Sequence, residues 1–521
     1  MNRPARAATV ARPVALALAL LAAIARPVHA QSISFPETPA GRAAAEALEV
    51  ANGEPDSAAL ARFIADRFAP GFRDAFPLSE HVRIWREMMA ESGGYDLREV
   101  RSGTDRRLEA LLRARRDGAL QVLDLEVEPE PPHRIMGMGI GPLDSRPEVP
   151  LGTAPTRELP DAEIAAELAD YVDRLVAADR FSGVVLLVRD GRVVFDRAYG
   201  LADRADGVPV HGDTKFNLGS MNKMFTAVTI AKLAEQGRLS LEDPIGKWLG
   251  AEWIRPEVGA KVTIAHLLTH TSGLGSYFTP EFFDASRTRF REVRDYAPLV
   301  AGDSLAFEPG SRWAYSNTGF LLLGAIVESV TGRSYFEVVR EVVYEPAGMT
   351  DTDAYSMDEV VPNLAVGYDP QFGPGGLRWR NNLFLHTIRG GPAGGGFSTA
   401  PDLLRFARAL RENRLLSPEW TARVTTPKPE LGSPGYGYGF QVWEDGSIGH
   451  GGGFPGISSV LKFDPQTDHA LIVLSNVSMG QPAVTRKVEQ LLRLDEPRAP
   501  GPPPPPTGNG SPARSTSEPR S

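Results

Sequence analysis

One segment restricts the fold more than any other: residues 221–235 are apolar on nearly every side of a helix and are followed by Gly237. A surface helix shows one apolar stripe, whereas a helix that is apolar all round must be enclosed by other elements. The chain has 521 residues, of which 42% are hydrophobic and 23% charged, enough for two or three domains. We therefore expect a large domain with this helix at its centre.

The elements expected around this helix indicate an α+β fold. A helix over 161–178 precedes a hairpin whose strands, 183–188 and 192–199, are joined by Asp190-Gly191. Two more strands, 456–463 and 469–475, come before a helix over 483–494, and a mostly helical insert lies in between. This order predicts an antiparallel sheet flanked by helices, with a helical subdomain beside it and a cleft between the two.

A proline-rich stretch over 129–160 separates this region from a differently patterned one. We expect an accessory domain over 31–145, a linker over 146–159 and the larger domain over 160–495. In the first region, helix patterns over 41–50, 57–68 and 79–91 precede an alternating strand at 123–128. Helices followed by antiparallel strands resemble the nuclear-transport-factor-2-like (NTF2-like) group, and an ordinary small α+β domain is the alternative.

Both ends of the chain have compositions that do not form a core. Arg3, Arg6 and Arg12 flank an apolar run over 14–25, and small residues precede position 31. This pattern predicts a signal peptide over 1–30 and an exported protein, periplasmic or secreted. An uncleaved membrane anchor is the alternative, but the run is shorter than the roughly 20 residues that cross a bilayer. Residues 496–521 include five consecutive prolines and predict a disordered tail.

Composition also excludes several classes of function. The net charge of -9 is spread along the chain without a basic stripe, so we expect no nucleic-acid partner. Cysteine is absent, which removes disulfides and a cysteine nucleophile. No cluster of His, Asp and Glu has ligand spacing, so we expect neither a metal nor a cofactor.

Two serines precede a lysine by three positions. Ser220 and Lys223 begin the buried helix, where this spacing places both side chains on one face. Burial disfavours the ammonium form, and a neutral lysine can take the serine proton. The alternative is a capping serine beside a solvated lysine. Ser459 and Lys462 lie in a strand-like run, where a spacing of three sends them to opposite faces.

Two further segments complete a candidate site. Tyr315 and Asn317 lie two apart in an extended stretch before an apolar helix over 319–330, so both can face a cleft while Ser316 turns aside. A phenol of depressed pKa could share the proton with Lys223. Packing is the alternative role of the tyrosine. The glycines of 449–456 could bring a free N-H to an oxyanion, or could form a plain turn.

Together, Ser-Met-Asn-Lys at 220–223, Tyr-Ser-Asn at 315–317 and His-Gly-Gly at 450–452 resemble the three-part signature of one family. That family holds class C beta-lactamases, D-alanyl-D-alanine carboxypeptidases, D-amino-acid peptidases and related esterases. The likeness covers roughly 160–494. Leu267–Leu274, which includes His270, and Gly394–Thr399 also resemble family segments, and we expect both to be structural loops.

The resemblance implies the following roles. Ser220 is the nucleophile, Lys223 and Tyr315 form the general-base pair, and the N-H groups of Ser220 and Gly453 form the oxyanion hole. Substrate ligands are Asn317 and the segment His450, Gly451 and Gly452. Beta-lactamases of this type have Lys-Thr-Gly where this chain has His-Gly-Gly, and histidine is largely neutral at pH 7.

This departure favours an ester or a D-amino-acid peptide as substrate over a beta-lactam. We therefore expect an acyl-serine hydrolase that acts on a small molecule or a peptide, with cell-wall fragments among the candidates. A class C type beta-lactamase is the first alternative. The second is a catalytically silent sensor that binds cell-wall peptides or penicillin.

Overall fold

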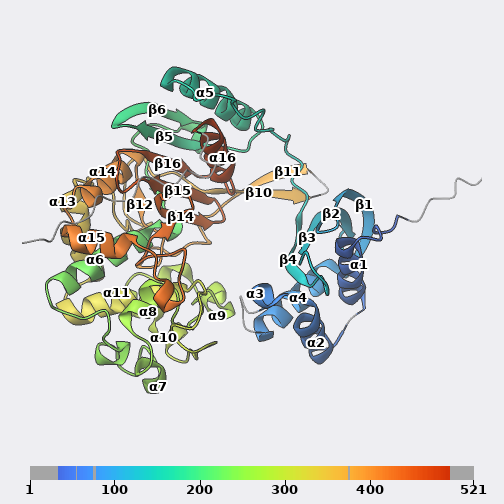
Figure 1. Cartoon of the computed structure of the whole chain (residues 1–521), viewed down its shortest axis with the longest axis horizontal. Coiled ribbons are helices and arrows are strands. Elements are labelled where there is room, and N and C mark those ends of the chain that lie inside the picture. The colour runs from blue at the N-terminus through green and yellow to red at the C-terminus, as the bar shows by residue number, and fades with distance from the viewer. Residues whose placement is uncertain (1–32, 54, 74–77, 374–375, 493–521) are drawn as a thin grey trace, which may run out of the picture. The chain divides into compact units, whose positions relative to one another are not determined.

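In the computed structural model, residues 33–53, 55–73, 78–373 and 376–492 are described, and the chain divides into two compact units between Leu143 and Asp144 (Figure 1). The segments expected to be a signal peptide and a disordered tail lie outside the described residues. None of the helices in the described ranges is long and apolar enough to cross a membrane.

The first unit places helices before an antiparallel sheet. Its helices are α1 (Pro39–Asn52), α2 (Ser57–Arg67), α3 (Pro70–Arg73) and α4 (Leu78–Ser92). Its strands are β1 (Tyr95–Gly103), β2 (Arg107–Ala114), β3 (Leu120–Val127) and β4 (Ile135–Pro142), paired in chain order. The Thr38 hydroxyl accepts the Gly41 N-H at 3.1 Å and begins α1, and Asp56 caps α2 in the same way. Likeness to the NTF2-like group stays a prediction.

The second unit is built on a six-stranded antiparallel sheet, in the order β13-β14-β15-β16-β5-β6 (Figure 1). Its strands are β5 (Gly183–Arg189), β6 (Arg192–Tyr199), β13 (Gln441–Val442), β14 (Ile448–Phe454), β15 (Ile457–Phe463) and β16 (Ala470–Ser475). Side chains alternate along β5: Val184 and Leu186 join the core around the central helix, whereas Val185 and Leu187 pack with the terminal helices. Those helices are α5 (Asp161–Ala177) and α16 (Gln481–Leu492).

A mostly helical part lies beside the sheet. Its helices are α6 (Asn222–Glu235), α7 (Pro256–Gly259), α8 (Ile264–Leu268), α9 (Pro280–Asp284), α10 (Ala297–Val300), α11 (Asn317–Thr331), α12 (Tyr335–Val339), α13 (Glu345–Ala347), α14 (Ala400–Arg411) and α15 (Pro418–Thr425). Short strands accompany them: β7 (Leu201–Asp203), β8 (Val208–Pro209), β9 (Phe216–Asn217), β10 (Tyr368–Gly373), β11 (Gly376–Asn381) and β12 (Phe397–Ser398).

Helix α6 lies at the centre of this unit. Every residue from Asn222 to Ala231 is buried, and α6 packs against α11, α12, α15 and β14. This enclosure is what the all-round apolar sequence requires. The predicted α+β class, with an antiparallel sheet, terminal helices and a helical part, is confirmed.

Candidate active site

The nucleophile candidate lies in a tight turn just before α6. Ser220 occupies a 3-10 turn, Gly219–Met221, in which Gly219 has a φ of +51°. The side chain of Asn217 accepts the Gly219 N-H at 2.9 Å and donates to the Gly395 carbonyl at 3.2 Å. These bonds hold the turn from both sides and fix the Ser220 hydroxyl relative to α6.

Lys223 lies one helical turn after Ser220 and is completely buried. Its Nζ is 3.1 Å from Ser220 Oγ, 2.9 Å from Asn317 Oδ1 and 2.5 Å from the Ala393 carbonyl oxygen. Burial lowers the pKa of Lys223 well below its ordinary value of 10.5, since an ammonium ion there loses its hydration without gaining a carboxylate partner. Burial therefore favours the neutral amine over the ammonium ion.

The partners of Lys223 also orient the lone pair of that amine. A neutral amine has two N-H bonds, and the oxygens of Asn317 and Ala393 can only accept them. A neutral amine would then have only its lone pair left for Ser220 Oγ, which lies 3.1 Å from Nζ. In that form Lys223 can accept the Ser220 proton, which is what a general base requires.

Tyr315 approaches the same serine from the other side of the site. Its hydroxyl is near enough to the Ser220 side chain for that side chain to influence the phenol pKa, and its ring centroid is 4.8 Å from Lys223 Nζ. Burial around the hydroxyl raises the pKa of Tyr315, although 37% of the residue surface is exposed. The expectation of a depressed phenol pKa is wrong, because desolvation outweighs the influence of Ser220. Tyr315 rests as a neutral phenol that can both donate and accept a proton.

Asn317 is the first residue of α11, two residues earlier than the sequence pattern indicates. Ser316 caps this helix, because its buried Oγ accepts the Gly319 N-H at 2.9 Å. Asn317 faces the site instead: its oxygen accepts from Lys223, and its Nδ2 donates to Ser276 Oγ at 3.1 Å. The structure therefore brings Ser220, Lys223 and Asn317 together.

The end of β14 provides the second oxyanion donor. Phe454 pairs with Ile457 across a two-residue turn, so Gly453, opposite Ser458, points its N-H away from β15. Gly451 has the same orientation, and its N-H reaches the Gln441 side chain at 3.0 Å. The Gly453 N-H faces the nucleophile turn.

The strand end and the nucleophile turn approach each other closely. A Cβ on Gly219 would lie 3.1 Å from the Gly453 nitrogen, and a Cβ on Gly452 would lie 3.3 Å from the Ser220 nitrogen. Within the described ranges, no backbone or side-chain acceptor takes the Ser220 N-H. The N-H groups of Ser220 and Gly453 are thus placed for an oxyanion. Gly452 lets the strand approach, and neither Gly451 nor Gly452 lines the cavity beside Ser220.

His450 lies differently from the expected substrate ligand. It is 2% exposed, its Nε2 is 2.9 Å from the Tyr436 hydroxyl, and its Nδ1 is 2.5 Å from the Gly451 carbonyl oxygen. Burial lowers the pKa of His450 to about 3. A neutral ring with both nitrogens engaged offers no positive charge to a substrate carboxylate.

Two contributions to the site were not predicted. The Ala393 carbonyl holds Lys223, although we expected the adjoining glycine run to be structural only. His270, expected in a structural loop, packs its ring 4.3 Å from that of Tyr315, and its Nδ1 accepts the Ser316 N-H at 3.0 Å. The glycine run was the only sequence signal for the contact of Ala393 with Lys223. No sequence pattern indicated that His270 packs against Tyr315.

A cavity of about 70 Å³ opens beside Ser220. Its other lining residues are Asn217, Gly219, Tyr277, Phe278, Phe282, Asn317, Leu385, His386, Thr387, Ala393, Gly394, Gly395, Gly453, Phe454 and Ile457. Nucleophile, amide ligand and oxyanion donor thus border one apolar cavity, which is the usual setting of a small-molecule site.

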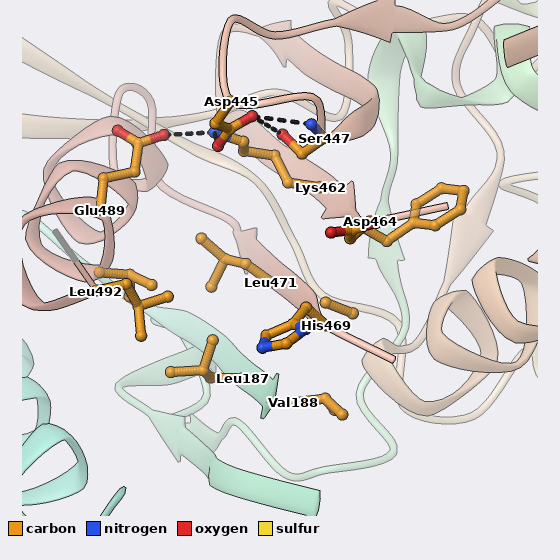
Figure 2. A pocket seen from close by; sticks show the side chains of 13 residues that line it. Leu187, Val188, Asp445, Ser447, Lys462, Asp464, His469, Leu471, Glu489 and Leu492 are labelled. Atoms are coloured by element: carbon orange, nitrogen blue, oxygen red, sulfur yellow. Dashed lines mark hydrogen bonds and ion pairs between the residues drawn. The ribbon is translucent and has the colours of Figure 1, made fainter. Parts of the chain in front are cut away.

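The second Ser-x-x-Lys pair does not form a site. Figure 2 shows Lys462 directed at Asp445 and Glu489, which its Nζ contacts at 3.3 and 2.6 Å. Lys462 faces the terminal helices with Val460, whereas Ser459 shares the opposite face with Leu461. The cavity in Figure 2 therefore contains an ion-paired lysine, and Ser459 is not among its lining residues.

A serine beside a buried lysine, facing two oxyanion donors on this fold, defines a serine hydrolase. Residues 168–494 match the beta-lactamase family, and the chain belongs to it. It is 32% identical over 335 residues to penicillin-binding protein 4* of Bacillus subtilis (strain 168), covering 60% of this chain and 72% of that protein. Esterase EstB of Burkholderia gladioli is 33% identical over 317 residues, covering 54% and 79%.

The fold has solved counterparts. The crystal structure of a D-stereospecific amidohydrolase from Streptomyces sp. is similar with a TM-score of 0.51 and 28% identity. The likeness covers 63% of this chain and 97% of that one. These similarities, together with the geometry, support hydrolysis through an acyl-serine.

Proposed function

We propose that this protein is an exported hydrolase that cleaves carboxylic esters and D-amino-acid amides through an acyl-enzyme on Ser220. The observation that carries the proposal is the buried, carboxylate-free environment of Lys223, whose Nζ is 3.1 Å from Ser220 Oγ. Export rests on the pattern of residues 1–30, with three arginines before a short apolar run.

Acylation follows from the positions of these groups. Ser220 Oγ attacks the substrate carbonyl carbon as its proton passes to Lys223 Nζ, and the carbonyl oxygen takes the electron pair of its π bond. The N-H groups of Ser220 and Gly453 receive the resulting oxyanion. The bond to the leaving oxygen or nitrogen then breaks, and the proton passes from Lys223 through the Tyr315 hydroxyl to the leaving atom.

Deacylation repeats the same proton path with water. A water molecule gives a proton to Lys223 as its oxygen bonds to the acyl carbon. The ester bond to Ser220 then breaks, and Oγ recovers the proton. The products are a carboxylic acid and the free enzyme, so atoms and charges balance without a further reactant. Asn317 binds Lys223 and lines the cavity, which leaves its Nδ2 beside the substrate.

Two observations support esters and D-amides over lactams. Beta-lactamases of this type have a lysine where this chain has the neutral His450. A lactam carboxylate would therefore meet no permanent positive charge at this position. Among the similar proteins, one is an esterase by name and another a D-stereospecific amidohydrolase, although a third is a penicillin-binding protein.

A three-substrate comparison tests the proposal. Purified wild type and Ser220→Ala are assayed with p-nitrophenyl acetate, N-acetyl-D-alanine p-nitroanilide and a chromogenic cephalosporin. We expect turnover of the ester and the D-amide that disappears in the variant. Fastest turnover of the cephalosporin would establish a beta-lactamase instead. Stoichiometric acylation without turnover of any substrate would establish a silent binding protein.

A further inference from the structure

Ser220 separates two dissimilar environments. On one side lies the cavity, whose wall includes Phe278 and Phe454, with ring centroids 5.8 Å apart. Outside the cavity wall lie Tyr315 and Trp313, which are 37% and 43% exposed. A substrate bonded to Ser220 has to place its two halves in these two environments.

The proton path decides which half goes where. The leaving atom must receive its proton from Lys223 or Tyr315, and the Tyr315 hydroxyl is near the Ser220 side chain. The leaving half therefore departs on the Tyr315 side, where the surface is open. The acyl half, whose carbonyl oxygen sits at the Gly453 N-H, lies beside the next residue, Phe454, and enters the cavity.

The cavity wall has no charge to offer an acyl group. Among the described residues that line it, none is Asp, Glu, Lys or Arg. Burial lowers the pKa of His386 and raises the pKa of Tyr277, so both are neutral at pH 7. Arg287 stacks on Phe282, with its guanidinium carbon 4.2 Å from the ring centroid, and is not part of the wall.

We propose that the cavity is an acyl-specific subsite, in which Phe278 and Phe454 select an uncharged, apolar acyl group while the leaving group is scarcely selected. This inference rests on the proposed acyl-serine function and narrows its substrate class to esters and amides whose acyl group is small, apolar and uncharged. A carboxylate in this cavity would lose its hydration without gaining a counter-ion, which disfavours its binding. A methylene chain or phenyl ring gains by burial between the two rings.

Two series of esters test the subsite in the wild-type enzyme. The first keeps the p-nitrophenyl leaving group and varies the acyl group through acetyl, butyryl, phenylacetyl and the monosuccinyl anion. We expect kcat/KM to rise from the acetyl to the butyryl ester. For the succinyl ester, whose acyl chain has the same number of carbons as butyryl, kcat/KM should be at least about tenfold lower than for butyryl. The second series keeps butyryl and varies the leaving group among phenols of similar pKa but different bulk. We expect kcat/KM to change by less than about threefold across this series.

A charge placed in the wall gives the sharper test. Phe278 is 37% exposed, so a longer polar side chain fits there without disturbing the core. We expect Phe278→Lys to raise the succinyl-to-butyryl ratio of kcat/KM about tenfold or more, while Phe278→Met, of similar length and uncharged, leaves that ratio near the wild-type value.

Equal succinyl and butyryl rates in the wild type, or a leaving-group effect larger than the acyl effect, would overturn the subsite. An unchanged ratio in Phe278→Lys would do the same. Failure of the proposed function looks different, because p-nitrophenyl acetate would then not be turned over at all, or its turnover would survive Ser220→Ala.

Discussion

Lys223 and Asn317 are 94 residues apart in the sequence, yet Nζ of the lysine donates to Oδ1 of the asparagine at 2.9 Å. This bond joins α6 to the start of α11, so the two helices hold one amine between them. With the Ala393 carbonyl as second acceptor, both N-H bonds of a neutral amine are taken, and its lone pair remains for Ser220 Oγ. The proposed proton transfer depends on that lone pair.

The buried amine has a consequence for stability. The pKa of Lys223 is lowered in the folded state and is near 10.5 in the unfolded state, so between these values unfolding takes up a proton. Wild-type stability should therefore rise with pH relative to Lys223→Met, by up to about 1.4 kcal/mol per pH unit. Urea unfolding at pH 7, 8 and 9 measures this. The exposed Lys247→Met variant is the control, and a parallel slope in both variants would contradict a neutral Lys223.

Lys223 and Tyr315 should act as a unit, because both lie near Ser220 along one proton path. We expect Lys223→Ala and Tyr315→Phe each to lower kcat by about 10²-fold or more. The double variant should be little worse than the worse single variant. Circular dichroism confirms that the folds are intact, and multiplicative losses would show that the two residues serve separate steps.

His450 should stay neutral throughout the working pH range. Its pKa is lowered to about 3, so binding of substrates with a free carboxylate should show no gain as pH falls through 6.5. Because the folded pKa lies below the unfolded value, wild type should lose stability relative to His450→Gln as pH falls from 6.5 toward 3. Titration of the ring by NMR measures the pKa directly, and a midpoint near 6 would refute this account of the histidine.

Substitution by alanine should affect activity to different extents at two neighbouring glycines. A Cβ on Gly452 would overlap the Leu218 carbonyl oxygen, whereas a Cβ on Gly453 meets nothing within 4 Å. Gly452→Ala should therefore push β14 away from the nucleophile turn and lower kcat/KM by about tenfold or more, while Gly453→Ala, which keeps its N-H, should change it by only a few fold. Equal losses in the two variants would mean that the close approach has no role in catalysis.

The sequence predicted those parts of the fold whose signals are local. The terminal helices, the strands of the β5-β6 hairpin and the buried helix α6 follow from periodicity and turn residues within each segment. The sequence pattern predicts that α11 begins at 319, two residues later than it does. Ser316 caps the helix rather than Asn317, and serine and asparagine both favour the capping position.

The site was predictable only as far as its residue types. Ser220 and Lys223 were paired from helix geometry, but the Ala393 carbonyl is a backbone group 170 residues from Lys223 and leaves no side-chain signal. The direction of the His450 ring depends on Tyr436, which sequence reasoning did not link to it. The direction of the Tyr315 pKa shift depends on how deeply the hydroxyl is buried, which is a property of the assembled fold.

The most direct test of the central claim is covalent labelling of the nucleophile. Folded protein is treated with a fluorophosphonate, and intact mass followed by peptide mapping locates the adduct. The account predicts one adduct per chain, on Ser220, with a rate that falls sharply in Lys223→Ala and no adduct in Ser220→Ala. An adduct on Ser459, or undiminished labelling of Ser220→Ala, would contradict it.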